Sequence, residues 1–168
     1  LKWSFYSKNN NTLSALHTMA EAKDIKEFEA ALKSATAPGL NVMYADAQNI
    51  AWWVFGEIAL KRNPNTDLIL DGASGKDEWN GTLPWDKKPH LVNPPSGYIV
   101  TANSRPMGFT DSQRGEWQSD DRFQTISKAL AEKDQWSAED VKSLQTMNFN
   151  HHTKAILDRK STRLNSSH

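Results

Sequence analysis

The chain has 168 residues, a length that suits one domain or one piece of a larger protein. Its 20 basic and 20 acidic residues balance, so its overall charge attracts neither nucleic acid nor an anionic membrane, and no apolar run is long enough to span a bilayer. Cysteine is absent, which excludes disulfides, thiolate catalysis and cysteine-ligated metal sites.

The first predicted elements are two helices within residues 12–35. Apolar residues recur at helical spacing in two stripes, and Asp24 lies at the break between them, where it would cap the second helix. Pro38 and Gly39 end the helical region. The first stripe consists of Leu13, Leu16, His17, Met19 and Ala20, and the second of Ile25, Phe28, Ala31, Leu32 and Ala35.

Residues 41–46 and 49–58 are predicted to be two strands joined by a tight turn at Asp46-Ala47-Gln48-Asn49. The run Ile50–Phe55 is apolar throughout, which predicts a strand buried on both faces.

The rest of the chain alternates between irregular and helical stretches. Residues 61–97 are rich in Pro, Gly, Asn and Asp and predict a long excursion with little regular structure. A strand at 97–102, a polar loop at 104–119 and helices at 121–132 and 137–147 follow. Ser137 and Asp140 have the spacing of a capping box at the start of the last helix.

The final nine residues, "KSTRLNSSH", show no apolar periodicity. We predict that residues 160–168 are a non-native tail and that the fold is confined to residues 1–159.

Composition and spacing alone reveal no complete active site. His151-His152 are adjacent, so they would not face one metal on a helix, and a surface position is favoured. The acidic pairs Asp77-Glu78 and Asp120-Asp121 are of a kind that is usually solvated surface. The glycines are too irregularly spaced for a phosphate-binding loop.

The order of several motifs is more informative. "NVMYAD-x-x-NIAWW", "GKDEWNGTLPW", "NPPSGYIVTANSRP" and "DDRF" follow one another from Asn41 to Phe123. In this order they resemble the penicillin acylase family of N-terminal nucleophile hydrolases, over about Trp3 to Leu157. The most specific part is Trp79–Pro106. The resemblance implies an α+β fold, part of a four-layer αββα arrangement of antiparallel strands with flanking helices.

The resemblance also implies a mechanism and two site residues. In the family, a mature chain begins with Ser, whose α-amino group takes the hydroxyl proton as the hydroxyl attacks an amide carbonyl. The family's oxyanion-stabilising Asn falls on Asn103, and its Arg near the nucleophile falls on Arg122, with Trp117 matching the Trp before it in "W-x-x-x-x-R". From the residues alone, Asn103 could be a strand-end turn residue, and the favoured interpretation of Arg122 is a helix-start residue paired with Asp120 or Asp121; the resemblance favours the functional role for both.

Several family members bind calcium, and the resemblance places one carboxylate ligand on Asp111, with the backbone carbonyl near Asp67 as a second oxygen. The chemistry itself needs no cofactor. The family also implies a periplasmic or secreted protein and a small-molecule amide substrate.

The family's nucleophilic Ser would lie N-terminal to Leu1. We therefore expect the chain to be a C-terminal-side segment of an amidohydrolase, inactive alone and partnered by the N-terminal part of the same precursor. The alternative is a non-enzymatic module for a sugar or peptide. In it, the Trp- and Gly-rich region 72–98 would form an aromatic cleft, although the seven tryptophans are more simply explained by core and interface packing.

Overall fold

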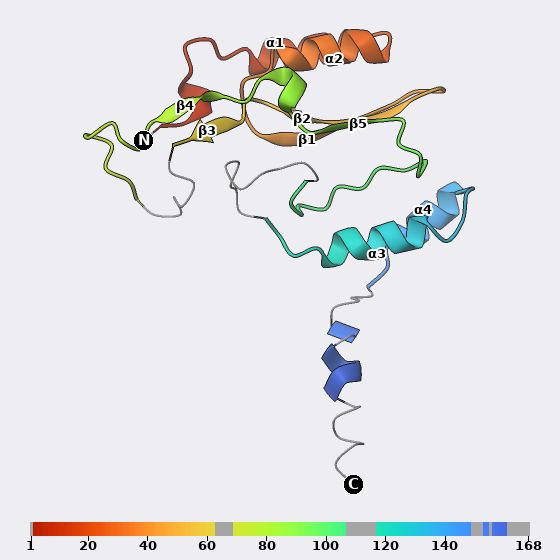
Figure 1. Cartoon of the computed structure of the whole chain (residues 1–168). Coiled ribbons are helices and arrows are strands. Elements are labelled where there is room, and N and C mark those ends of the chain that lie inside the picture. The colour runs from red at the N-terminus through yellow and green to blue at the C-terminus, as the bar shows by residue number, and fades with distance from the viewer. Residues whose placement is uncertain (1, 63–68, 107–116, 149–152, 155, 161–168) are drawn as a thin grey trace. The chain divides into compact units, whose positions relative to one another are not determined.

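The computed structural model describes residues 2–62, 69–106, 117–148, 153–154 and 156–160 (Figure 1). The chain divides into two compact units. The first contains the described residues up to Pro95 together with Pro106, and the second contains Ser96–Arg105 and the described residues from Trp117 onward. The described residues form helices and short antiparallel strands, so the predicted α+β class is confirmed.

The first unit begins with a 3₁₀ turn, η1 (Ser4–Tyr6), and two helices, α1 (Thr12–Glu21) and α2 (Ile25–Lys33). The Oδ1 atom of Asp24 accepts hydrogen bonds from the backbone N–H groups of Lys26 and Glu27, both at 2.9 Å. The predicted cap is therefore confirmed. It satisfies two backbone donors that a helix N-terminus leaves without an intrahelical partner.

The predicted apolar stripe is correct for α2 and wrong for α1. Leu32 is fully buried, but on α1 Leu13 is 83% exposed and Leu16 is also exposed. The buried residues of α1 are instead Thr12 and Ala15, one turn apart. The Thr12 hydroxyl donates to the carbonyl of Ala37, which turns the small-residue face of α1 towards the core.

A three-stranded antiparallel sheet lies next to these helices. β1 (Leu40–Ala45) and β2 (Ile50–Phe55) form the predicted hairpin, and β5 (His90–Val92) pairs with the other edge of β2. A separate two-stranded sheet joins β3 (Ala59–Lys61) to β4 (Trp79–Thr82), and a 3₁₀ turn, η2 (Trp85–Lys87), precedes β5.

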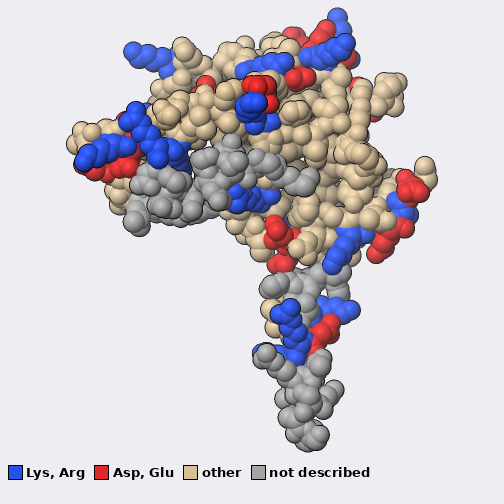
Figure 2. Space-filling model, in the orientation of Figure 1, with Lys and Arg blue, Asp and Glu red and all other residues tan. Residues whose placement is uncertain are grey.

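The core of the first unit lies where α1 and α2 cross one face of the sheet (Figure 1). Every residue from Ala51 to Phe55 is buried, which confirms that β2 is buried on both faces. Over α1 and α2, Figure 2 shows basic and acidic side chains intermixed on the solvent side. The buried cluster consists of Ala15, Leu32, Ala35, Ala51, Trp53 and Phe55.

One prediction for the middle of the chain is confirmed and another is wrong. Among its described residues, the excursion at 61–97 has little regular structure beyond three short elements, β4, η2 and β5, and its two strands pair with partners distant in sequence. The strand at 97–102 is not formed. Among the described residues, no strand pairs with Tyr98–Thr101, and a strand needs such a partner for its backbone hydrogen bonds.

The second unit contains the predicted pair of helices, α3 (Asp121–Leu130) and α4 (Ala138–Gln145). The capping box is present: Ser137 Oγ accepts from the Asp140 N–H, and Asp140 Oδ2 accepts from the Ser137 N–H. The Lys133 ammonium and the Ser137 backbone and hydroxyl donors lower the pKa of Asp140 to about 2. Residues 153–154 and 156–160 are helical, whereas His151-His152 lie outside the described residues.

Among the described helices, none is both long enough and apolar enough to cross a bilayer.

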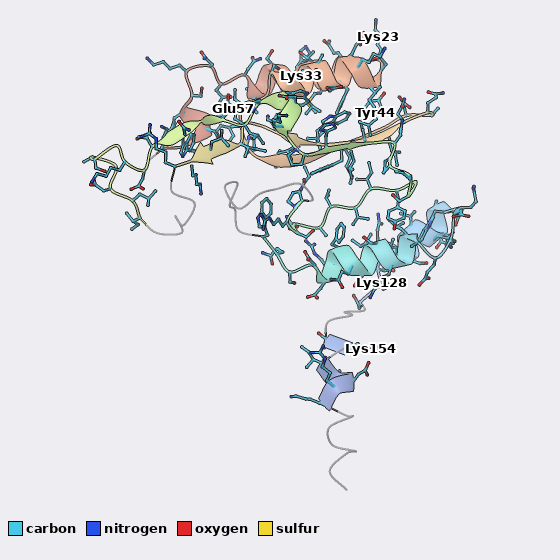
Figure 3. The ribbon with its side chains drawn as sticks, viewed as in Figure 1. Lys23, Lys33, Tyr44, Glu57, Lys128 and Lys154 are labelled. Carbon is cyan, nitrogen blue, oxygen red and sulfur yellow. The ribbon has the colours of Figure 1, made fainter. Side chains whose placement is uncertain are left out.

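The turn of the β1–β2 hairpin is organised by the carboxylate of Asp46. It accepts the hydroxyl of Tyr44 at 2.7 Å and the backbone N–H groups of Gln48 and Asn49 at 2.7 and 2.6 Å. These bonds, that of Tyr44 foremost, lower the pKa of Asp46 to about 2, and the same hydroxyl bond raises the pKa of Tyr44 to about 12. Tyr44 lies on the side of the sheet that faces α2, with its ring 5.0 Å from that of Phe28 (Figure 3).

Replacing Asp46 by Asn should therefore lower the pKa of Tyr44 towards its ordinary value of 10.0, because the ring loses its anionic acceptor. Ultraviolet titration of tyrosinate absorbance measures this shift.

The wild-type hairpin should also lose stability as the pH falls from about 3.8 to about 2, and Asp46→Asn should flatten that limb of the stability curve. Asp86→Asn, which removes an exposed carboxylate from η2, is the control and should leave both curves unchanged.

The end of β2 depends on a glycine at Gly56. Its φ is +83°, and a Cβ built there would lie 2.5 Å from the carbonyl oxygen of Pro38. The carbonyl of Gly56 accepts a hydrogen bond from the buried ammonium of Lys88 at 2.6 Å. Burial lowers the pKa of Lys88, and the charge of Glu57 partly opposes that effect.

Comparing Gly56→Ala with Gly81→Ala separates the stability lost to an unfavourable backbone conformation from the stability lost to steric overlap. Gly81 has a similar φ of +85° but no atom within 4 Å of its virtual Cβ, so its replacement should cost about 1–2 kcal/mol of unfolding free energy. Gly56→Ala should cost a further ~1–3 kcal/mol because the methyl group overlaps backbone atoms. Chemical denaturation measures both values, and equal losses would contradict the steric argument.

Candidate functional site

Asn103 lies in the second unit, in the irregular stretch that follows Tyr98. It is exposed, it follows the buried Ala102, and its φ is +61°. Asn is one of the few residues besides Gly that adopt this left-handed conformation readily. The backbone alone thus favours Asn here, in agreement with the turn-residue interpretation, and any functional role depends on the side chain.

Arg122 lies in the first turn of α3, and its side chain reaches back to Asn103. Its Nη2 atom donates to Asn103 Oδ1 at 2.5 Å and to the carbonyl of Ala102 at 2.9 Å. The structure therefore brings together the two site residues that the motif spacing selected. From its position at the start of α3, Arg122 contacts Asn103 and the carbonyl of Ala102.

The contact fixes the orientation of the Asn103 amide. A guanidinium group has only donors, so the atom that faces it is the amide oxygen. The two N–H donors of the amide then lie on the other branch of the side chain. Because a charged donor strengthens the bond to the oxygen, this orientation is favoured over the flipped one.

A backbone contact that the sequence did not reveal holds the same residue. The N–H of Gln118 donates to the carbonyl of Asn103 at 2.9 Å, so the segment that leads into α3 is tied to the loop. Trp117, the first residue of the "W-x-x-x-x-R" spacing, directly precedes this contact. A backbone hydrogen bond does not depend on the type of side chain. The only sequence signal for this contact was therefore the spacing of Trp117 and Arg122.

The arrangement can supply a fixed hydrogen-bond donor. Asn103 is held at its carbonyl by Gln118 and at its amide oxygen by Arg122, so the amide nitrogen has a defined direction. Donors fixed in advance are what a developing oxyanion requires, because the protein then reorganises little during the reaction.

Trp85, in the most specific part of the motif, belongs to the packing of the first unit. Its Nε1 donates to Glu29 at 3.1 Å, and its ring packs against the buried cluster. Burial opposes ionisation of Glu29, but the bonds from Trp85 and Lys33 outweigh it and lower its pKa. The ammonium of Lys33, marked in Figure 3, lies 5.7 Å from the Trp85 ring centre. Trp85 therefore packs against the core of the first unit, and its ring is not part of an open aromatic cleft.

Asn93 in the same block also has a packing role. With a φ of +47°, it exchanges two bonds with Ile50: its side-chain oxygen accepts from the Ile50 N–H, and its own N–H donates to the Ile50 carbonyl, both at 2.9 Å. Asn93 therefore extends the pairing of β5 with β2 by one residue beyond Val92.

The calcium prediction has no structural test. Asp111 and Asp67 both lie outside the described residues. Within the described parts of the chain, no group of three or more His, Asp or Glu side chains could hold a metal ion.

Residues 1–166 match the model of the penicillin amidase family. The chain belongs to this family, as the motif order and the Asn103–Arg122 pair indicated.

Curated relatives are acylases by name. The chain is 29% identical over 122 residues to an acyl-homoserine lactone acylase, QuiP, of Pseudomonas fluorescens strain Pf-5, covering 71% of this chain and 15% of that protein. It is 30% identical over 132 residues to the penicillin G acylase of Escherichia coli, covering 76% of this chain and 15% of that protein. The chain therefore spans about 15% of the length of these relatives.

A solved structure shows the same fold. The thermostable penicillin G acylase of Alcaligenes faecalis matches 85% of this chain and 26% of its own, with a TM-score of 0.72 and 24% identity. This likeness shows that the two chains share a fold over the matched region, in agreement with the predicted α+β fold class.

Proposed function

We propose that the chain is a segment of an amidohydrolase that cleaves a linear amide through an acyl-enzyme on an N-terminal Ser outside these 168 residues. Membership of the penicillin amidase family supports the hydrolase class. The observation that carries the proposal within the chain is the bond from Arg122 to the amide oxygen of Asn103.

In the proposed reaction, the N-terminal Ser supplies the base and the nucleophile, and this segment supplies a hydrogen-bond donor to the oxyanion. The α-amino group of the Ser has an ordinary pKa of roughly 7.7–8.0, so it serves as the general base near neutral pH. Its hydroxyl gives its proton to the α-amino group as it attacks the amide carbonyl, and an oxyanion forms. Asn103 donates a hydrogen bond from its amide nitrogen to that oxygen. The intermediate then collapses, the C–N bond breaks and the leaving amine takes the proton held by the α-amino group. Water hydrolyses the acyl ester, which releases the acid and restores the Ser hydroxyl.

Arg122 acts through Asn103. Its guanidinium fixes the amide oxygen, so the amide nitrogen is aimed before substrate arrives. Its second bond, to the carbonyl of Ala102, ties the same guanidinium to the loop backbone. Arg122 is therefore a positioning residue whose loss misdirects a donor.

The substrate class follows from the reaction and from the relatives. The names of the matched proteins include acyl-homoserine lactone acylase and penicillin G acylase, and both names denote acylases. We infer an N-acylated amine as substrate. We also infer that the N-terminal part of the same precursor supplies the nucleophile and that the mature protein is exported.

No cofactor takes part in this chemistry. A structural calcium ion with Asp111 among its ligands remains a proposal from the family resemblance.

In the full-length protein, Asn103→Gly should lower kcat by roughly 10²–10³, the usual effect of removing one oxyanion donor. Gly accepts the left-handed backbone, so the melting temperature should change little. Asn103→Ala should lower kcat equally but also cost stability, because Ala tolerates this φ poorly. Steady-state kinetics and thermal denaturation separate the two effects. An unchanged kcat in Asn103→Gly would remove the side chain from the mechanism.

Arg122→Leu should reduce kcat more than it reduces stability, because the amide of Asn103 loses the group that orients it. Lys128→Leu removes a basic side chain from the same helix without touching Asn103, and it should leave kcat unchanged. Kinetics and melting curves of the full-length variants test this pair. A lower melting temperature with wild-type kcat in Arg122→Leu would show that the residue only supports the helix.

A further inference from the structure

Strand β4 contains the one Asn-Gly pair of the sequence, Asn80-Gly81. Both residues are exposed. Asn is among the chemically labile residues, because its side-chain carboxamide can be attacked by the backbone nitrogen of the residue that follows. Gly permits this attack best, since it has no side chain to hinder the approach of its nitrogen.

The pairing of β3 with β4 is irregular at this point. On β3 one residue separates the two paired positions, whereas on β4 two residues, Asn80 and Gly81, separate theirs. Such a bulge disrupts the ladder of backbone hydrogen bonds locally. Gly81 has a φ of +85°, and apart from its chain neighbours no heavy atom lies within 4 Å of the position that a Cβ would take. The space around the Gly81 backbone is therefore open.

The side chain of Asn80 is also less restrained than comparable side chains in the chain. Among the described residues, it forms no hydrogen bond. The amide oxygen of Asn103, by contrast, accepts from Arg122 at 2.5 Å. Asp71, which also precedes a Gly, accepts the Ala73 N–H on its Oδ1 at 3.0 Å. Neither of these side chains is free to turn towards the next backbone nitrogen, whereas that of Asn80 is.

The sheet that carries the pair has only two strands, and it is separate from the three-stranded sheet of the core (Figure 1). Two-stranded sheets are marginally stable in water, so local opening of β3–β4 costs less free energy than opening of the buried β2. Each opening frees the Asn80 backbone to rotate until its side-chain carbon meets the Gly81 nitrogen.

We propose that Asn80-Gly81 is a site of spontaneous covalent modification, at which Asn80 becomes aspartate or isoaspartate. The Gly81 backbone nitrogen gives up its proton and bonds to the side-chain carbonyl carbon of Asn80. The bond from that carbon to the side-chain nitrogen breaks, ammonia leaves with the proton, and a five-membered succinimide ring remains. Water then opens the ring. Cleavage at the former side-chain carbonyl gives aspartate, and cleavage at the main-chain carbonyl gives isoaspartate.

The reaction requires only water and uses no residue of the proposed hydrolase site. Its isoaspartate product carries an additional methylene group in the backbone of β4. The paired positions on the two sides of the bulge would then no longer keep their register with β3. Both products also add a carboxylate close in sequence to Glu78, which is already bonded to Lys2.

Peptide mapping of the full-length protein by mass spectrometry tests the proposal. During incubation at mildly alkaline pH, the peptide with Asn80 should gain the mass difference between an oxygen atom and an NH group. Its rate should exceed that of the peptide with Asn103 by at least about 10-fold. Enzymatic carboxyl methylation of isoaspartate should label the same peptide. Asn80→Gln, whose longer side chain closes no five-membered ring, is the matched control and should remove both signals.

The same rates measured in denaturant separate the effect of the fold from that of the dipeptide. Because the bulge leaves the pair open, Asn80 in the folded protein should convert within about 10-fold of its rate in denaturant. Slower conversion than this would overturn the proposal, since it would show that β4 protects the pair. A rate for Asn80 in the folded protein that exceeds the rate for Asn103 by less than about 10-fold would overturn it as well.

Discussion

Burial of the central strand β2 is the constraint on which the first unit depends. β2 pairs with β1 on one side and β5 on the other, and Ala51–Phe55 are all buried. Its Trp53 and Phe55 side chains form the cluster that holds α1 and α2. Hydrophobic burial of large side chains is the dominant favourable contribution to folding, so the elements on either side are stabilised mainly by contact with this strand.

Polar contacts organise the candidate site in the second unit. Asn103 meets two requirements at once: a backbone with φ of +61° and an amide whose oxygen receives the Arg122 guanidinium. A glycine would satisfy the first requirement and fail the second, and most other residues would fail the first. The joint requirement explains why an amide side chain stands at this point of an otherwise irregular stretch.

One block of sequence serves both units. Between Trp79 and Pro106, Trp85 packs on the core and Asn93 completes the pairing of β5 with β2, whereas Asn103 belongs to the site. The motif that identifies the family most specifically is thus largely a packing motif. Its specificity arises because residues with special backbone angles and bonded side chains tolerate few replacements.

The sequence alone determined the features that depend on near neighbours. The cap at Asp24, the capping box at Ser137 and the hairpin turn at Asp46 all formed as expected, because each bond joins residues two to three positions apart. Motif order and spacing also selected Asn103 and Arg122 and indicated the family. Their catalytic roles rest on the family resemblance and not on these local patterns.

Only the tertiary structure decided the features that depend on distant partners. β5 is a strand because it lies beside β2, with Trp52 opposite Leu91, whereas Tyr98–Thr101 has strand-forming residues but no described strand beside it. The buried face of α1 was chosen by the reach of the Thr12 hydroxyl to Ala37, against a more apolar stripe that includes Leu13. In each case the deciding hydrogen bond joins residues far apart in sequence, and periodicity carries no information about such a partner.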